Sequence, residues 1–512
     1  MGGTGISNPA VTFQIIPAQQ LSTVKEQKVL IVGQMLTGTA TAGSLVQEIG
    51  NANEEDALFG ATSMVAGMVR RFKKINKISQ LDVLPLDDAG GAVDATAVVT
   101  VTGPATEDGR LTFVVGSKRD FNVNVDITSG DTATDIGDAI VAAFDAVSKK
   151  PFTEANAIGV VTFTATNGGT HANDWSLAYT GSVAGVTIAL TGWAGGATDP
   201  TLTGVLDAIG DIRYQTIVWA SAYALTEVED LLNSRFNTSN SVLDGVAVQV
   251  KKGTLATVKS YVSALNSQSL AIAGNRTIDL ADRKGTAILE MPDISASEFA
   301  ALRSLRLTQD APLGDVLTTV ASLDQFGGIS IASLPYFNTL MPYHDPETPG
   351  DGWAEEEQRE LEDNGAFVFG SNIAFNSVIL GQTVTTYLTD IAGNDDDSYK
   401  YLNTIDTASV IREFFFANTK SRYAQTRLTD GDLIPLRDMA NESSIRAFLN
   451  QLYDELAENV LVQAGSAAKK DFNDNLIISV DVRNGNASIS CAPLLVTQFR
   501  VALGTIQINF GG

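Results

Sequence analysis

The segment Lys28-Val29-Leu30-Ile31-Val32-Gly33 decides the fold, because it is a short apolar run that ends at a turn residue. Such a run is typical of a fully buried β-strand. A helix is expected after it, from about Glu54 to Lys77, where apolar residues recur every three or four positions. Gln80-Leu81-Asp82-Val83-Leu84-Pro85 then predicts a second strand. A strand, a helix and a strand in succession favour an α/β domain.

The same alternation of strands and helices resumes after Pro200. Helices are expected at residues 225–236 and 255–265, and strands at residues 216–220, 245–250, 269–273 and 286–290. Strands that are separated by helices predict a mainly parallel sheet. We assign residues 21–87 and 201–391 to this α/β domain and call it the body.

Residues 88–200 interrupt the body and differ from it in composition, being rich in Thr, Ala, Val and Gly. One helix is expected here, after the capping-box-like start Thr132-Ala133-Thr134-Asp135. Strands are expected at residues 97–102, 111–115, 121–127, 160–165, 176–180 and 186–190. We therefore predict a β-rich inserted domain, called the insert. Its boundaries resemble loops, so removal of residues 92–199 is expected to leave the body folded.

Residues 392–503 form the predicted α+β C-terminal unit. Helices are expected at residues 407–423 and 442–462, followed by strands at residues 476–482 and 488–491. Together these predictions describe a multidomain α/β protein with an inserted β-rich domain and an α+β C-terminal domain.

The two ends of the chain are predicted to be arms, at residues 1–20 and 504–512. Val11-Thr12-Phe13-Gln14-Ile15 and Ile506-Gln507-Ile508-Asn509-Phe510 both alternate apolar and polar residues, as half-buried strands do. A strand needs neighbours for its backbone N–H and C=O groups. We therefore expect both segments to pair with strands of other copies of the chain, with Pro17 and Gly504 as hinges.

The composition limits the possible functions. The net charge of −25 argues against binding to nucleic acid or to an anionic membrane surface, and 44% hydrophobic residues allow large cores. The single cysteine, Cys491, excludes a disulfide within the chain. We find no secretory signal and no apolar stretch long enough to span a bilayer.

No catalytic residue, metal site or cofactor site is predicted. The two histidines, His171 and His344, lie in different predicted domains, although a distant serine could still accompany His344. The segment 33–40 resembles a phosphate-binding loop after a strand, but Thr39 stands where that loop needs lysine. The acidic runs at residues 355–357 and 395–397 are interpreted as solvated loops rather than cation sites.

Four motifs, taken in order, resemble the contractile-tail sheath proteins of Mu-like bacteriophages. They are Gly130-Asp131-Thr132-Ala133-Thr134-Asp135-Ile136-Gly137-Asp138-Ala139-Ile140; Thr162-Phe163-Thr164-Ala165-Thr166-Asn167-Gly168-Gly169 with Ala172-Asn173-Asp174; Gly195-Gly196-Ala197-Thr198-Asp199-Pro200; and Val482-Arg483-Asn484 with Leu494-Leu495-Val496-Thr497-Gln498-Phe499-Arg500-Val501. Together they span much of the chain. The acidic segment 345–363 departs from the family pattern, and its role is open.

The resemblance implies a structural subunit and not an enzyme. It implies a helical homopolymer around a tail tube, contraction after a signal from the baseplate, and arms that pair with neighbouring subunits. The implied partners are other copies, the tube protein, and the baseplate and tail terminator proteins, with no direct nucleic acid and no membrane. The implied location is the virion, after synthesis in the bacterial host cytoplasm. The C-terminal unit would face the tube, with Lys469 and Lys470 as tube-facing candidates.

Two other functions stay open on the sequence alone. One is another self-assembling virion or surface-lattice protein, which would form flat arrays instead of hollow tubes. The other is an α/β hydrolytic enzyme, because this class of scaffold hosts many chemistries.

Overall fold

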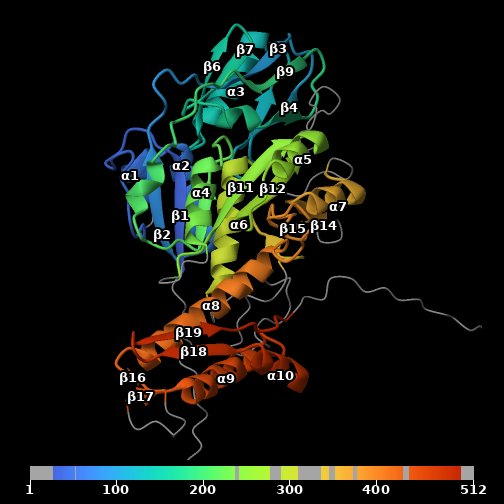
Figure 1. The fold of residues 1–512 in the computed structure, drawn as a ribbon. Helices are drawn as coiled ribbons and strands as arrows, with labels where there is room; N and C mark the ends of the chain where they lie inside the picture. The colour runs from blue at the N-terminus through green and yellow to red at the C-terminus, as the bar shows by residue number, and fades with distance from the viewer. Residues whose placement is uncertain are drawn as a thin grey trace, which may run out of the picture.

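The computed structural model describes residues 27–51, 53–236, 242–276, 290–308, 336–344, 352–372, 377–430 and 438–496. Figure 1 shows the insert at one end of the molecule, the body in the middle and the C-terminal unit at the other end. Within the ranges given above, none of the helices combines the length and the apolar character that a bilayer crossing needs.

The body is built on an eight-stranded sheet in the order β13-β15-β14-β12-β11-β10-β1-β2. The strands from β2 to β14 run parallel, and at the far edge β15 runs antiparallel to both of its neighbours, β14 and β13. Their bounds are β1 (Lys28–Gln34), β2 (Gln80–Leu86), β10 (Thr216–Trp219), β11 (Val246–Gly253), β12 (Leu270–Arg276), β13 (Leu340–Met341), β14 (Ala366–Asn372) and β15 (Ser377–Leu380). The predictions of β1, β2, β10, β11 and β12 are confirmed, and the parallel pairing is as expected. The strand predicted at residues 286–290 lies outside the described residues except for Glu290.

The helix predicted from residue 54 to residue 77 is two helices, α1 (Glu54–Phe59) and α2 (Met64–Ile75). Gly60 ends the first with a φ of +82°, which is a backbone conformation that favours glycine. Ser63 then begins the second, because its side chain accepts a hydrogen bond from the backbone N–H of Ala66. The apolar stripe continues across the break, so periodicity alone did not reveal it.

The remaining helices of the body are α4 (Thr226–Arg235), α5 (Leu255–Ser263), α6 (Pro292–Leu307) and α7 (Glu355–Asp363). Helix α6 was not predicted. All its residues except Ile294 are buried, so it has no polar face and no amphipathic pattern. The interpretation of residues 355–357 as a solvated loop is wrong, because they belong to helix α7. These three glutamates form its first turn, where negative charge is favourable to the helix dipole.

The insert contains two antiparallel sheets and helix α3 (Ala133–Asp145). One sheet has the order β6-β7-β3-β9 and the other has the order β5-β4-β8. The strands are β3 (Thr96–Thr102), β4 (Gly109–Val115), β5 (Asn122–Ile127), β6 (Phe152–Ala157), β7 (Val160–Ala165), β8 (Leu177–Thr180) and β9 (Thr187–Ala194). All but β6 were predicted, and the predicted capping box at Thr132 and Asp135 is confirmed.

The C-terminal unit contains helices α8 (Leu402–Tyr423), α9 (Glu442–Glu458) and α10 (Ser466–Asp474). Two short parallel strands, β16 (Arg427–Leu428) and β17 (Met439–Ala440), and the hairpin of β18 (Ile477–Asp481) and β19 (Asn486–Ser490) complete it. Helix α8 connects two hydrophobic cores. Its first turns contribute Leu402 and Ile405 to the core of the body, and Val410 and Ile411 belong to the core of the C-terminal unit.

Candidate assembly site in the C-terminal unit

The hairpin of β18 and β19 was predicted as two strands and is confirmed as an antiparallel pair. Ile477 pairs with Ser490 and Asp481 with Asn486, so the register is regular over the whole hairpin. Gly485, with a φ of +70°, lies in the turn between the strands. Among the described residues, each strand pairs only with the other, and each therefore has one outer edge of backbone groups without a strand beside it.

An open groove lies beside β19, with a volume of ≈ 650 Å³. It is lined mainly by apolar side chains, which come from α8, α9 and β19 and include Phe415, Phe416, Ile445, Leu449, Ala487 and Ile489. The groove therefore combines an open strand edge with apolar side chains. An added strand could pair with the edge and bury alternate side chains in the groove.

Exposed apolar side chains also gather in this part of the chain. The exposed fractions are 42% for Val460, 66% for Ile477, 40% for Val482 and 53% for Leu494. Single exposed apolar residues are ordinary in folded proteins, so these four by themselves assign no contact surface.

The predicted arm strands, residues 11–15 and 506–510, and the predicted hinges Pro17 and Gly504 lie outside the described residues. Lys469 and Lys470 lie on α10, and both pair with acidic residues of the same unit. The Nζ atom of Lys469 lies 2.5 Å from Oδ1 of Asp454, and Lys470 pairs with Asp474. Their role at the tube stays a prediction.

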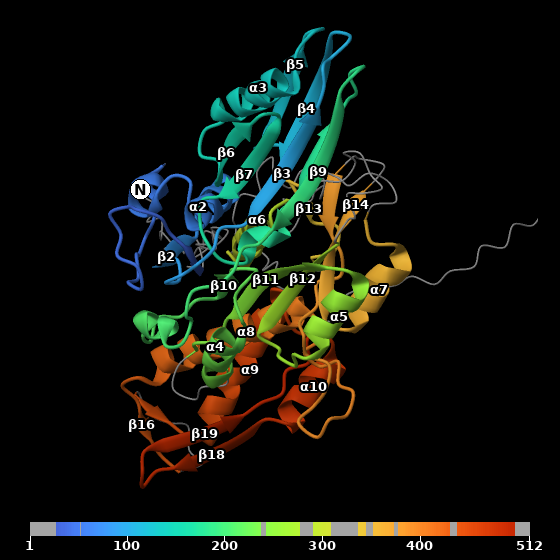
Figure 2. The ribbon, with the colours of Figure 1, turned by 90° about the horizontal axis from the view of Figure 1, so that it is seen from above.

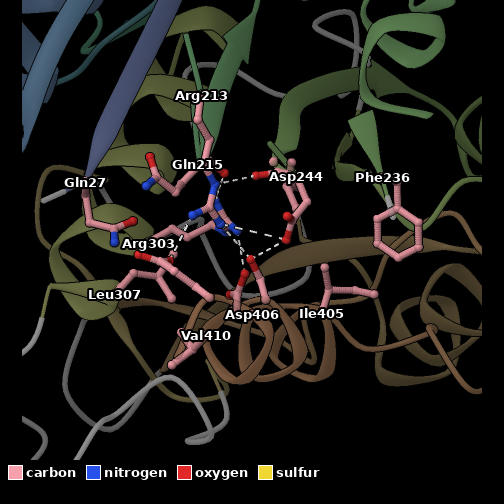
Figure 3. Close-up of a pocket in the computed structure, with 14 residues that line it drawn as sticks. Gln27, Arg213, Gln215, Phe236, Asp244, Arg303, Leu307, Ile405, Asp406 and Val410 are labelled. Carbon is pink, nitrogen blue, oxygen red and sulfur yellow. Dashed lines mark hydrogen bonds and ion pairs between the residues drawn. The ribbon is translucent and has the colours of Figure 1, made fainter. Parts of the chain in front are cut away.

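A charged seam joins α8 to the body (Figure 3). Arg213 of the body donates to Glu413 and Ser409 of α8, over 2.8 and 2.9 Å. Arg412 of α8 lies 3.0 Å from Asp244 of the body. These contacts fix the orientation of α8, and with it the C-terminal unit, on the body.

A second ion pair in the seam is fully buried. Arg303 of α6 pairs with Asp406 of α8, which also accepts a hydrogen bond from the hydroxyl of Tyr336. Burial alone would lower the pKa of Arg303, but Asp406 and Tyr336 shift this pKa upward overall. The charge of Arg303 is therefore compensated inside the seam.

The loop after β1 does not form a phosphate site. The amide of Asn167, from the insert, accepts a hydrogen bond from the backbone N–H of Met64 at 2.9 Å and donates to the carbonyl of Met35 at 3.0 Å. It thereby fills the N-terminal end of α2, the position at which helices commonly bind phosphate. Gln34 holds the same segment by donating to the carbonyl of Gly168 at 2.7 Å.

A buried ionic cluster centred on Arg71 joins the insert and the body at a second place. Arg71 of α2 lies 2.7 Å from Glu298 of α6 and 2.7 Å from Asp120 of the insert. It also lies 3.3 Å from Glu290, which accepts a hydrogen bond from Ser117 of the insert. The cluster therefore connects three segments that are distant in the sequence.

The two histidines are both buried. His171 lies in the short 3-10 helix His171–Asp174, and burial lowers its pKa to about 4. The Nε2 atom of His344 lies 2.8 Å from Oγ of Ser295, and its Nδ1 atom lies 3.4 Å from Glu298. This order of groups resembles a catalytic triad. Ser295, however, has an exposed fraction of 0%, so its hydroxyl is not presented to a substrate.

The ionisation of Glu298 supports a structural reading of that arrangement. Burial would raise its pKa, but His344 and Arg71 lower this pKa to about 2 overall. The charged form of Glu298 pairs with the Arg71 guanidinium inside the buried cluster. Among the described residues, no group of three or more His, Cys, Asp or Glu side chains is placed to hold a metal ion.

No family model matches the sequence. Among solved structures, the chain is similar to a sheath tail protein from Desulfitobacterium hafniense, with 12% identity, a TM-score of 0.45, and coverage of 95% of this chain and 99% of the other. It is also similar to the helical sheath of the anti-feeding prophage in its contracted state, with 10% identity, a TM-score of 0.44, and coverage of 99% of both chains.

The sequence is also similar to a curated protein over almost its whole length. It is 27% identical to the Mu-like prophage FluMu tail sheath protein of Haemophilus influenzae over 493 residues, which cover 94% of this chain and 92% of the relative. The resemblance to the contractile-tail sheath proteins of Mu-like bacteriophages, predicted from the sequence motifs, is thereby confirmed.

Proposed function

We propose that this chain is the structural subunit of a contractile phage tail sheath. It polymerises helically around a tail tube and, on contraction, drives the tube through the host envelope. The observation that carries the proposal is the similarity to a tail sheath protein over 94% of the chain. The role is structural rather than catalytic, and the chain works as part of the virion.

The groove beside β19 supports a specific mode of assembly. A terminal arm of one subunit adds to the open edge of β19 in another subunit, and its alternate apolar residues enter the groove. Each main-chain hydrogen bond contributes only about 0.5–1.5 kcal/mol net, so a single joint is weak. A joint repeated at every subunit can nevertheless hold a lattice together.

Each segment of the chain has its own place in the proposed sheath. The arms at residues 1–20 and 504–512 connect subunits, the body at residues 21–87 and 201–391 is the frame, and the insert at residues 88–200 lies on the outside. The C-terminal unit at residues 392–503 faces the tube. The other partners are the baseplate and tail terminator proteins.

Electron microscopy of the purified full-length chain and of two truncated forms tests the proposal. The full chain should form hollow helical tubes, and removal of residues 1–16 or 504–512 should leave folded monomers. Circular dichroism and the melting temperature serve as the folding control. Flat arrays of the full chain would favour a surface-lattice protein, and normal tubes from either truncated form would refute the arm mechanism.

A further inference from the structure

The outward face of the four-stranded sheet of the insert carries no charged residue. The strand registers place fourteen side chains on this face, and all are Thr, Ala or Val: Thr96, Val98, Thr100 and Thr102 of β3; Thr153, Ala155 and Ala157 of β6; Val160, Thr162 and Thr164 of β7; Thr187, Ala189, Thr191 and Ala194 of β9. We call these residues the threonine face. All of them are exposed or half-buried.

The two faces of this sheet are unequal. Helix α3 contacts β3, β6 and β7, and the side chains on that side include the buried Val99, Phe152 and Phe163. Figure 2 shows α3 on one side of the strands, and among the described elements no helix covers the other side. Ile158, at the turn beside the threonine face, is 87% exposed and extends the uncharged surface.

The absence of charge is unusual for this chain. The whole chain contains 18% charged residues, so fourteen positions of that composition would include about two or three charges. The whole chain carries a net charge of −25, so two copies repel each other over most of their surfaces. The threonine face is a place where copies can approach closely without that repulsion.

We infer that the threonine face is a contact surface for a neighbouring copy of this chain within the polymer. This inference rests on the proposed function, because it needs an assembly. Small side chains allow close approach of backbones, and threonine hydroxyls can exchange hydrogen bonds across the contact.

The size of the face indicates a contact that forms only in the polymer. Four strands spaced about 4.8 Å apart and about 20 Å long give a face of roughly 300–400 Å². Two partners would together bury roughly 600–800 Å², less than the about 1,200–2,000 Å² of stable isolated complexes. The contact is therefore expected to add to the arm joints and not to make dimers on its own.

Cysteine labelling of the full chain tests the inference. Thr100→Cys lies at the centre of the threonine face, and Asn124→Cys lies on β5 of the other sheet, with Cys491→Ser as the common background. Both cysteines should react rapidly with a maleimide reagent in monomers. In assembled tubes, labelling at position 100 should slow at least tenfold while labelling at position 124 continues.

A charged pair of substitutions gives a second measurement. Thr100→Glu with Ala189→Glu should leave the melting temperature of the monomer unchanged and lower the pelleted fraction at least tenfold, whereas Asn124→Glu should pellet normally. Equal labelling of position 100 in tubes and monomers would overturn the inference and leave the proposed function standing. Protection that appears only in whole phage tails would assign the face to another protein and also overturn it. If the unaltered chain forms no assembly, the proposed function and the inference both fail.

Discussion

The junction between the insert and the body differs from the C-terminal unit in how completely one chain satisfies its own groups. At the junction, Arg71 is only 2% exposed and is surrounded by carboxylates, and Asn167 pairs with two segments of the body. In the C-terminal unit, Ile477 is 66% exposed and β19 borders an open apolar groove. At the junction, these charged and amide groups find their partners within one subunit. The C-terminal unit, in contrast, has exposed apolar side chains and a groove to which a partner can bind.

This difference separates stability from assembly. Changes at the closed junction leave buried charges without partners and therefore act on the free energy of unfolding. A change at an exposed position of the groove, such as Ala487, removes few existing contacts and therefore acts mainly on association.

Ala487→Glu places a carboxylate in the groove beside β19 and should abolish assembly. Ala487 is exposed, so the free energy of unfolding of the monomer should change by less than about 0.5 kcal/mol. Sedimentation and negative-stain microscopy measure assembly, and urea unfolding measures stability. Ser488→Glu is the matched control, because the next residue of a strand points to the opposite face. If both variants fail to assemble equally, the groove has no special role.

Arg71→Met should lower the free energy of unfolding by about 3–5 kcal/mol, because it leaves Glu298, Glu290 and Asp120 without their shared cation. Thermal and urea unfolding measure the loss. Lys259→Met is the control, since its pair with Glu360 is about 40% exposed on both sides and should matter by less than about 0.5 kcal/mol.

The ionic cluster around Arg71 changes the expected effect of removing residues 92–199. Removal of residues 92–199 deletes the partners that Asp120 and Asn167 provide, so the structure predicts destabilisation of the body instead of an intact fold. If Arg71→Met is as stable as Lys259→Met, the ionic cluster does not stabilise the junction. The expectation that the body stays folded without residues 92–199 would then stand again.

Glu362→Gln should flatten the dependence of stability on pH. Burial raises the pKa of Glu362 to about 7, from an ordinary value of 4.5. Its protonated form therefore stabilises the fold below about pH 4.5, and this contribution is lost as the pH rises through 7. At pH 8 the variant should be more stable than the parent by roughly 1–2 kcal/mol, after allowance for partial exposure.

Melting temperatures measured at several pH values between 4.5 and 8 check this expectation. Glu356→Gln, at an exposed position of the same helix, is the matched control and should keep the parental pH profile. A Glu362→Gln profile parallel to that of the parent would show that this carboxyl group does not titrate in the fold.

Replacement of both Lys469 and Lys470 by alanine should have the smallest effect. Exposed ion pairs contribute little to stability, so the melting temperature should not change measurably. If the two lysines face the tube, binding to the tube should weaken by less than tenfold, because each charge is already shared with an aspartate. Cosedimentation with purified tubes measures it, and unchanged binding would remove both residues from the tube surface.

The sequence predicts the parts of the fold that have a regular pattern. Short apolar runs predict β1, β2, β10, β11 and β12, and the strands predicted at residues 476–482 and 488–491 correspond to β18 and β19. Helix α6 escapes prediction because burial on all sides removes its amphipathic stripe. The break between α1 and α2 at Gly60 could not be predicted, because the apolar periodicity continues across it.

The candidate site could be predicted only in part. The strands of the hairpin were predicted from the local sequence, whereas the groove forms where Phe415, Leu449 and Ile489 meet from three separate elements. The contacts at the junction also arise from tertiary folding, since nothing near Asn167 in the sequence indicates that its side chain contacts α2. Contacts of this kind depend on tertiary folding, which local patterns do not encode.

The amide of Asn167 at the start of α2 has a consequence for any ligand of this sheet. An anion and Asn167 cannot occupy that helix end together, so a phosphate could enter only by expelling residues 167 and 168. Expulsion would also release the hydrogen bonds to Met35 and Gln34. Binding of an anion at the N-terminal end of α2 and the present position of the insert therefore exclude each other. Asn167 competes with any such ligand from within the same chain.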